Sequence, residues 1–85
     1  MGHTMSKYSP LGDYLKALTS SSVTLQFREI DEMVGGLPPS SRTDRTWWGN
    51  TTNRTRAQAQ AWMGVGWLVD TVSFTTNQVT FMRRS

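Results

Sequence analysis

Apolar side chains in the first 36 residues change spacing twice. A short helix is predicted by four residues at the i, i+3, i+4 and i+7 spacing of one buried face, Leu11, Tyr14, Leu15 and Leu18. Ser9 before Pro10 is a typical helix start, with a hydroxyl cap and proline at the first helical position. The serine- and threonine-rich stretch 19–22 then ends the helix.

The next apolar residues alternate with polar ones and predict a half-buried strand through Val23, Leu25 and Phe27. Helical spacing returns at once, because Phe27, Ile30 and Val34 share one face while the charged residues between them face water. Gly35 and Gly36 are expected to end this second helix.

The middle of the chain predicts a turn and two further helical segments. Leu37-Pro38-Pro39 is the turn, residues 40–48 form a short helix, and Gly49-Asn50 interrupts the chain again. The next helix is expected to begin near Thr52 or Asn53 and to end at Gly64 or Gly66. On its helical wheel, one arc is apolar (Ala57, Ala61, Trp62 and Val65) and the opposite arc is polar (Asn53, Arg56 and Gln60).

A two-stranded hairpin is predicted for the end of the chain. Leu68, Val72 and Phe74 are expected on one face of its first strand, residues 75–77 form the turn, and Val79 and Phe81 align the returning strand. The order is helix, strand, helix, short helix, helix, strand, strand. This α+β order is typical of a winged helix, a helix-turn-helix variant with a two-stranded wing, and residues 6–85 are expected to form that single domain.

Composition narrows the class of protein. The chain has 85 residues, no cysteine, and 36% hydrophobic residues, which suits one small folded domain and excludes disulfide scaffolds and cysteine-ligated zinc. No apolar run approaches the length of a membrane helix, and no secretion signal is seen, so we expect a cytoplasmic protein without a membrane partner. Residues 1–5 look like a cloning remnant or a disordered start. The Asn-x-Thr triplets at Asn50 and Asn53 are interpreted as coincidental matches to the glycosylation pattern.

Charge is distributed unevenly. Residues 1–36 carry three basic side chains against four acidic ones, whereas residues 37–85 carry six arginines against two aspartates. All four tryptophans and four of the arginines lie between Leu37 and Trp67. A basic half rich in arginine favours an anionic partner, and nucleic acid is the leading candidate.

The sequence also resembles a small uncharacterised bacterial and phage domain family, whose pattern reads roughly YxPLxxYL, FxEIE, LPxSA, WWxN, AWxxxG and VxF. The matching positions extend from Tyr8 to Arg83 and include the paired tryptophans Trp47 and Trp48. Ser41 and Asp31 depart from the alanine and glutamate that are usual in the family. The resemblance implies a domain that occurs alone or attached to nuclease-like or regulatory modules and is expected to bind DNA.

The candidate residues for a duplex DNA interface are arginines and amides between positions 42 and 60. Asn53, Arg56 and Gln60 are candidates for groove contact, because arginine pairs with guanine and amides pair with adenine; the alternative is a solvated helix face. Arg42, Arg45 and Arg54 are candidate phosphate contacts, although Arg45 could instead pair with Asp44 or with acids of the second helix.

The adjacent tryptophans leave two arrangements open, because neighbouring residues of a helix point about 100° apart. Either one is buried and Trp48 lies over the polar surface to stack on a base, or both are buried by different elements. Trp62 and Trp67 are expected in the core. The wing tip 75–78 offers hydroxyls and amides to phosphate or is a plain turn, and Arg83 and Arg84 are interpreted as a flexible basic tail.

Catalysis has little support in the sequence. The only histidine is His3, and no nucleophile motif or phosphate loop is present, so we expect no enzyme, metal or cofactor. The hypothesis is a small DNA-binding domain of a bacterial, plasmid or phage regulatory or defence protein. The alternative is a protein-interaction module that captures a host factor, with the acidic second helix and the tryptophans as its contact surface. A homodimer is a further alternative.

Overall fold

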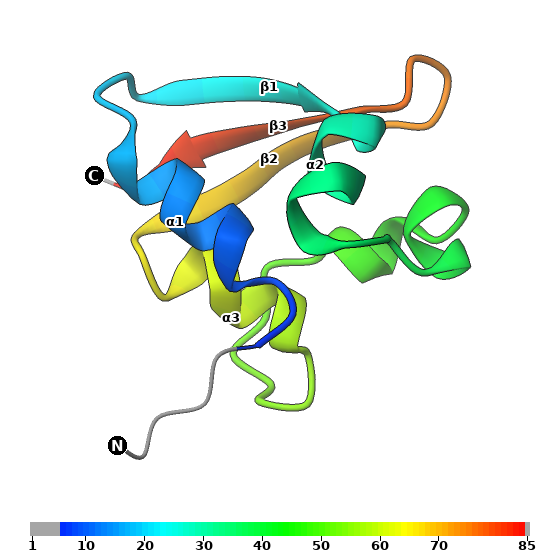
Figure 1. Cartoon of the computed structure of the whole chain (residues 1–85), viewed down its shortest axis with the longest axis horizontal. Helices are drawn as coiled ribbons and strands as arrows, with labels where there is room; N and C mark the ends of the chain where they lie inside the picture. Colours follow the sequence, from blue (N-terminus) through cyan, green and yellow to red (C-terminus); the bar gives the residue numbers. More distant parts are fainter. Residues whose placement is uncertain (1–5, 85) are drawn as a thin grey trace.

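A computed structural model describes residues 6–84, so the expectation for residues 1–5 lies outside the described residues. Figure 1 shows three α-helices beneath one face of a three-stranded sheet. The elements in chain order are α1 (Ser9–Ala17), β1 (Ser22–Gln26), α2 (Phe27–Val34), the 3-10 helices η1 (Pro39–Arg42) and η2 (Arg45–Trp48), α3 (Ala57–Met63), β2 (Trp67–Ser73) and β3 (Gln78–Arg83). The chain is therefore a small α+β domain.

The sheet has the strand order β1-β3-β2, and both neighbouring pairs are antiparallel. The residue pairs of β1 and β3 identify the two ends of the sheet. Gln26 pairs with Gln78 beside the turn that joins β2 to β3, whereas Ser22 pairs with Met82 at the opposite end. The turn between β2 and β3 and the start of α2 therefore lie at the same end of the molecule (Figure 1).

Leu68 of β2 does not share the face of the sheet that was predicted for it and Val72. The register shifts between Val69 and Thr71, so one extra residue occupies β2 and reverses the alternation. Val72 pairs with the fully buried Val79, whereas Leu68 pairs with Met82, which is 42% exposed. Leu68 thus lies on the outer face of the sheet, and Phe74 lies beyond the strand in the turn.

The first two helices begin close to where the pattern places them. Ser9 does not cap α1; it is the first helical residue, and Tyr8 precedes it. Leu11 and Leu15 are buried as predicted, while Tyr14 is 37% exposed. Phe27 belongs to α2 rather than to the strand, and Gly35 ends α2 with φ of 75°.

A stack of aromatic rings forms the centre of the core. Trp48 lies parallel to Phe27 on one side and to Trp62 on the other, with ring centroids 5.5 Å and 6.0 Å apart. Trp47 meets Trp48 edge to face at 4.6 Å. Both members of the pair are buried, at 7% and 1% exposure, so the expectation that Trp48 lies over the polar surface is wrong.

The third helix starts later than predicted. Residues 51–56 do not continue α3, because their side chains hydrogen-bond to nearby backbone groups and favour turns. Asn53 Oδ1 accepts from the Thr55 N–H at 3.0 Å, and Thr51 Oγ1 accepts from the Asn53 N–H at 3.1 Å. The helix ends at Met63 before Gly64, as the sequence predicted.

Candidate nucleic-acid interface

The late start of α3 separates the residues predicted for groove contact. Asn53, Arg54 and Arg56 lie in the loop before the helix, and only Gln60 lies on it. The predicted polar helix face of Asn53, Arg56 and Gln60 is therefore not formed. Gln60 is the one exposed polar side chain of α3, since Gln58 is buried and the other residues of the helix are apolar.

Arg42 holds the 3-10 segment against α2. Its Nη2 lies 3.4 Å from Asp31 Oδ1, and the same carboxylate oxygen accepts from the Leu37 N–H at 2.6 Å. The sequence offered acids of the second helix as partners for Arg45, but Arg42 is the residue that makes this pair. The ion pair is solvent-exposed, so it orients Arg42 more than it stabilises the fold.

Arg45 is held by the hairpin. Its Nη1 donates to the carbonyl oxygen of Val72 at 2.6 Å, and its guanidinium lies 5.2 Å from the centre of the Phe74 ring. It pairs with neither Asp44 nor an acid of α2. A carbonyl and an aromatic face leave the positive charge uncompensated, and Arg45 remains exposed.

Arg56 lies within electrostatic range of η2. Asp44 caps this 3-10 helix by accepting from the N–H and the hydroxyl of Thr46, at 3.0 Å and 2.6 Å. These two hydrogen bonds, led by that of the hydroxyl, lower the pKa of Asp44, and the positive charge of Arg56 lowers it further.

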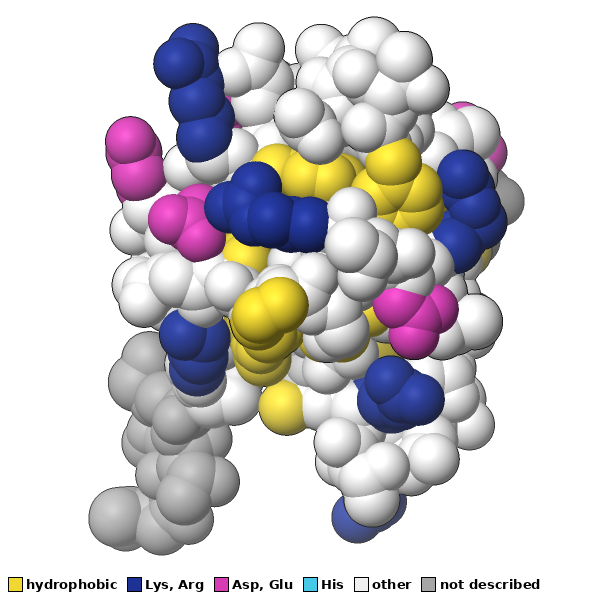
Figure 2. Space-filling view, turned by 90° about the vertical axis from the view of Figure 1, so that its right-hand side faces the viewer, with side chains coloured by type: hydrophobic (Ala, Val, Ile, Leu, Met, Phe, Trp, Pro, Cys, Tyr) yellow, Lys and Arg dark blue, Asp and Glu magenta, His cyan; other side chains and the backbone are white. Residues whose placement is uncertain are grey.

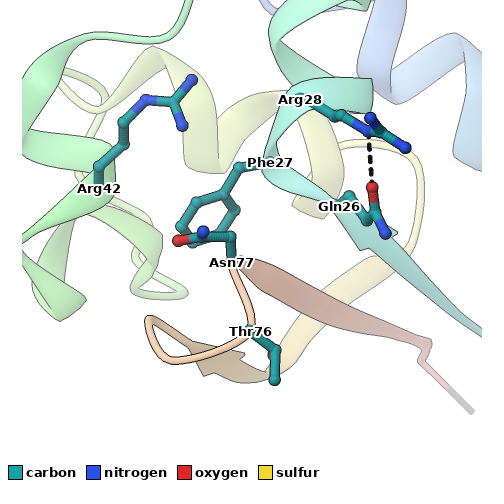
Figure 3. Close-up of a pocket in the computed structure, with 6 residues that line it drawn as sticks. All are labelled: Gln26, Phe27, Arg28, Arg42, Thr76 and Asn77. Carbon is teal, nitrogen blue, oxygen red and sulfur yellow. Dashed lines mark hydrogen bonds between the residues drawn. The ribbon is translucent and has the colours of Figure 1, made fainter.

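A hollow of about 400 Å³ lies at the end of the sheet that holds the β2–β3 turn. Its walls come from the start of α2, from η1 and from the turn between β2 and β3, and it is lined by Gln26, Phe27, Arg28, Arg42, Thr76 and Asn77 (Figure 3). Arg28 was interpreted only as a solvated residue of the second helix. No periodicity in the sequence could have revealed this role, because the hollow joins segments about 50 residues apart.

Positive charge on the described surface is largely unpaired. Five exposed arginines lie outside the C-terminal strand β3 and the residue that follows it, Arg28, Arg42, Arg45, Arg54 and Arg56. Within residues 6–84, Arg42 with Asp31 is the only ion pair. Figure 2 shows one face of the molecule, on which basic side chains occur from top to bottom with acidic and apolar side chains between them. We call this set of five residues the arginine face.

Two buried polar contacts fix the segment that carries Arg42 and Arg45. The Trp48 indole Nε1 donates to the carbonyl oxygen of Ser41 at 2.7 Å, and Gln58 Nε2 donates to that of Trp47 at 3.1 Å. Asn50 bridges β2 and α3, since its Oδ1 accepts from Trp62 Nε1 at 2.9 Å. With its indole bonded and its rings covered, Trp48 offers no surface to a base, so it is not part of the interface.

The basic C-terminus is not a flexible tail at Arg83. This residue ends β3, its Nη2 donates to the carbonyl oxygens of Leu18 and Ser20, and its guanidinium lies 5.2 Å from the Trp67 ring centre. The Arg84 N–H donates to the Gly66 carbonyl oxygen at 2.8 Å. Both arginines lie at the end of the sheet opposite the β2–β3 turn.

A family model described as Domain of unknown function (DUF7662) matches residues 8–85. The chain belongs to this family. The DUF7662 match confirms the predicted resemblance to an uncharacterised domain family. No curated protein and no solved structure matches the chain.

The described residues of the DUF7662 domain contain neither a metal-ligand cluster nor a membrane-spanning helix. Among residues 6–84, no three histidine or acidic side chains come together in a group that could hold a metal ion. None of the helices in this range is long and apolar enough to cross a membrane.

Proposed function

We propose that this domain binds duplex DNA by contacting backbone phosphates with the arginine face. The observation that carries the proposal is the set of five exposed arginines with one ion pair among the described residues. Arginine matches the geometry of phosphate, and unpaired guanidinium groups keep their charge for a partner. Arg45 supports this most directly, because β2 and Phe74 orient it without neutralising it.

We further propose that the fold is a winged helix. Support comes from the element order and from a sheet in which β3 lies between β1 and β2, so that β2 and β3 form the wing. The turn of this wing lies beside Arg28, Arg42 and Arg45. In this arrangement the wing and the η1–η2 segment contact the DNA together.

The proposed mode differs from recognition by a helix in the major groove. The short α3 presents Gln60 as its one exposed polar side chain, and its Nε2 lies 3.4 Å from the carbonyl oxygens of Thr51 and Asn53. Base-specific contacts need several side chains at a groove. Binding is therefore expected to depend strongly on salt and weakly on sequence.

Titration of a fluorescent duplex of random sequence at two salt concentrations tests the proposal. The logarithm of affinity should fall with the logarithm of salt concentration, with a slope of about −0.9 per phosphate contact. The double substitution Arg54→Gln/Arg56→Gln should weaken binding and make the slope less negative by about 1 per lost contact. Both side chains are exposed, so the fold should persist, as circular dichroism would verify.

A matched control removes the same charge at the other end of the molecule. Lys16 is exposed near the end of α1, close to the Leu18 carbonyl that Arg83 contacts, and Arg84 follows β3. Lys16→Gln/Arg84→Gln should bind DNA almost as the parent does. An equal loss in both variants would show dependence on net charge rather than on this face. No binding at moderate salt would contradict the DNA proposal altogether.

The biological setting is proposed from the motif resemblance. The pattern from Tyr8 to Arg83 resembles that of bacterial and phage domains, so we propose a role in bacterial, plasmid or phage regulation or defence. The finding that would favour a protein-interaction module is binding to a purified protein partner without any shift of duplex DNA.

A further inference from the structure

The hollow between α2, η1 and the β2–β3 turn has the chemistry of an anion site. Two guanidinium groups, Arg28 and Arg42, line it from different elements, and Thr76 and Asn77 line it from the turn (Figure 3). We propose that it binds a phosphate group. The choice of phosphate over carboxylate rests on the proposed function; the site itself needs only these side chains.

Arg28 is positioned without losing its charge. Its Nε donates to Gln26 Oε1 at 2.7 Å, shown as the dashed line in Figure 3. The partner is a neutral amide, so the two Nη groups stay available for a bidentate contact with phosphate oxygens. No described carboxylate lies within ion-pair distance of Arg28.

The guanidinium of Arg42 contacts one carboxylate, that of Asp31. Only its Nη2 contacts Asp31, at 3.4 Å, which leaves the remaining N–H donors free for a ligand. The second acid nearby, Glu29, accepts from the Gln26 N–H at 2.8 Å. Both carboxylates thus have backbone N–H partners of their own, since Asp31 also accepts from Leu37, and they help to fix the shape of the wall.

The opposite wall is fixed before a ligand arrives. The Phe27 N–H donates to the Asn77 carbonyl oxygen at 2.8 Å, which ties the turn to the first residue of α2. Asn77 has φ of 58°, and its side chain makes no hydrogen bond to the rest of the described chain. A free amide donor in a preorganised turn lowers the entropic cost of holding an anion.

The size of the hollow is that of a small-ligand site. Its volume of about 400 Å³ falls within the usual range of ligand pockets and exceeds that of a phosphate ion. The buried Phe27 contributes to its lining. The remaining space suits the sugar that carries the phosphate, whether the source is a free nucleotide or a DNA strand.

Nitrogen–proton correlation spectra of the labelled domain test the site, with inorganic phosphate, deoxyadenosine monophosphate and a short duplex as separate probes. Sodium chloride keeps the ionic strength constant. The amide signals of residues 26–28, 76 and 77 should shift and saturate with a phosphate probe. Arg28→Gln/Arg42→Gln should weaken this response at least tenfold, whereas Lys16→Gln, which removes a cation outside both the hollow and the arginine face, should leave it unchanged.

The probes separate the two sources of phosphate. A response to inorganic phosphate and the mononucleotide assigns the hollow to small phosphates, and a response to duplex alone assigns it to a backbone phosphate. The proposal is overturned if no probe shifts these amides, or if the shifts persist in Arg28→Gln/Arg42→Gln.

The two proposals can fail separately. DNA binding that depends on Arg54 and Arg56 but does not perturb the hollow would overturn this inference and keep the proposed function. Binding of phosphate in the hollow without any DNA binding would keep this inference and overturn the proposed function.

Discussion

The indole Nε1 of Trp62 donates a hydrogen bond to Oδ1 of Asn50 at 2.9 Å. The same oxygen accepts from the Val69 N–H at 2.8 Å, while Asn50 Nδ2 donates to the Val69 carbonyl oxygen at 2.9 Å. One amide thus extends the hydrogen bonding of β2 and also satisfies a fully buried indole. This explains structurally why an asparagine follows the tryptophan pair.

Replacing Asn50 by alanine should destabilise the domain by about 1–3 kcal/mol, because the buried Trp62 N–H loses its acceptor. Urea denaturation measures the change. Asn53→Ala is the matched control, since Asn53 belongs to the other Asn-x-Thr triplet and its side chain bonds only to Thr55 in the same loop. Equal losses in the two variants would contradict the role assigned to Asn50.

Gly12 marks the closest approach of α1 to α3. A Cβ at this position would lie 2.6 Å from the Ala61 carbonyl oxygen, too close for either helix to stay in place. We expect Gly12→Ala to cost about 1–3 kcal/mol despite the better helix propensity of alanine. The neighbouring, exposed Asp13→Ala should change the free energy of unfolding by less than about 0.5 kcal/mol. A stabilised Gly12→Ala variant in thermal denaturation would disprove this packing.

Trp48 should behave as a core residue in solution. Trp48→Phe leaves the buried Ser41 carbonyl without its donor and should cost at least about 1 kcal/mol. Because all four tryptophans are buried, or nearly so, acrylamide should quench their emission weakly, and added DNA should not quench it by stacking. DNA quenching that disappears in Trp48→Phe would contradict the buried position.

Asp44 should make stability depend on acid pH. Its pKa in the folded domain is lowered, first by the Thr46 hydroxyl, so the ionised form stabilises the fold above the unfolded pKa. This contribution is lost as pH falls through the lower, folded pKa. Thr46→Val should raise the pKa of Asp44, measured by the carboxyl carbon shift in a titration from about pH 6 to pH 2. An unchanged pKa would show that the hydroxyl contact does not form.

Apolar spacing predicted most of the elements. Val23 with Leu25, and Ile30 with Val34, repeat at intervals that match one strand and one helix, and local geometry alone brings each pair to one face. The bulge in β2 could not be predicted in this way, since it depends on how β2 pairs with β3. Its single extra residue moved Leu68 to the outer face.

The start of α3 was mispredicted for a local reason that is visible in the sequence. Thr51, Asn53 and Thr55 favour turns through side chain to backbone hydrogen bonds, and this preference prevailed over the helical spacing that linked Asn53 to Gln60. The set of candidate interface residues therefore differs from the set predicted from the sequence. Arg42, Arg45, Arg54 and Arg56 remain candidates, Trp48 is excluded by burial, and Arg28 is added by the hollow.

Local periodicity and composition are enough to give the α+β class, the order of the helices and strands, and the excess of arginine in the second half of the chain. The contacts of each polar side chain depend instead on how distant segments pack together. Arg45 and Arg83 each donate to a backbone carbonyl and lie over an aromatic ring, yet Arg45 does so beside the β2–β3 turn and Arg83 at the opposite end of the sheet. Their difference arises from contacts between segments far apart in the chain, which sequence spacing does not encode.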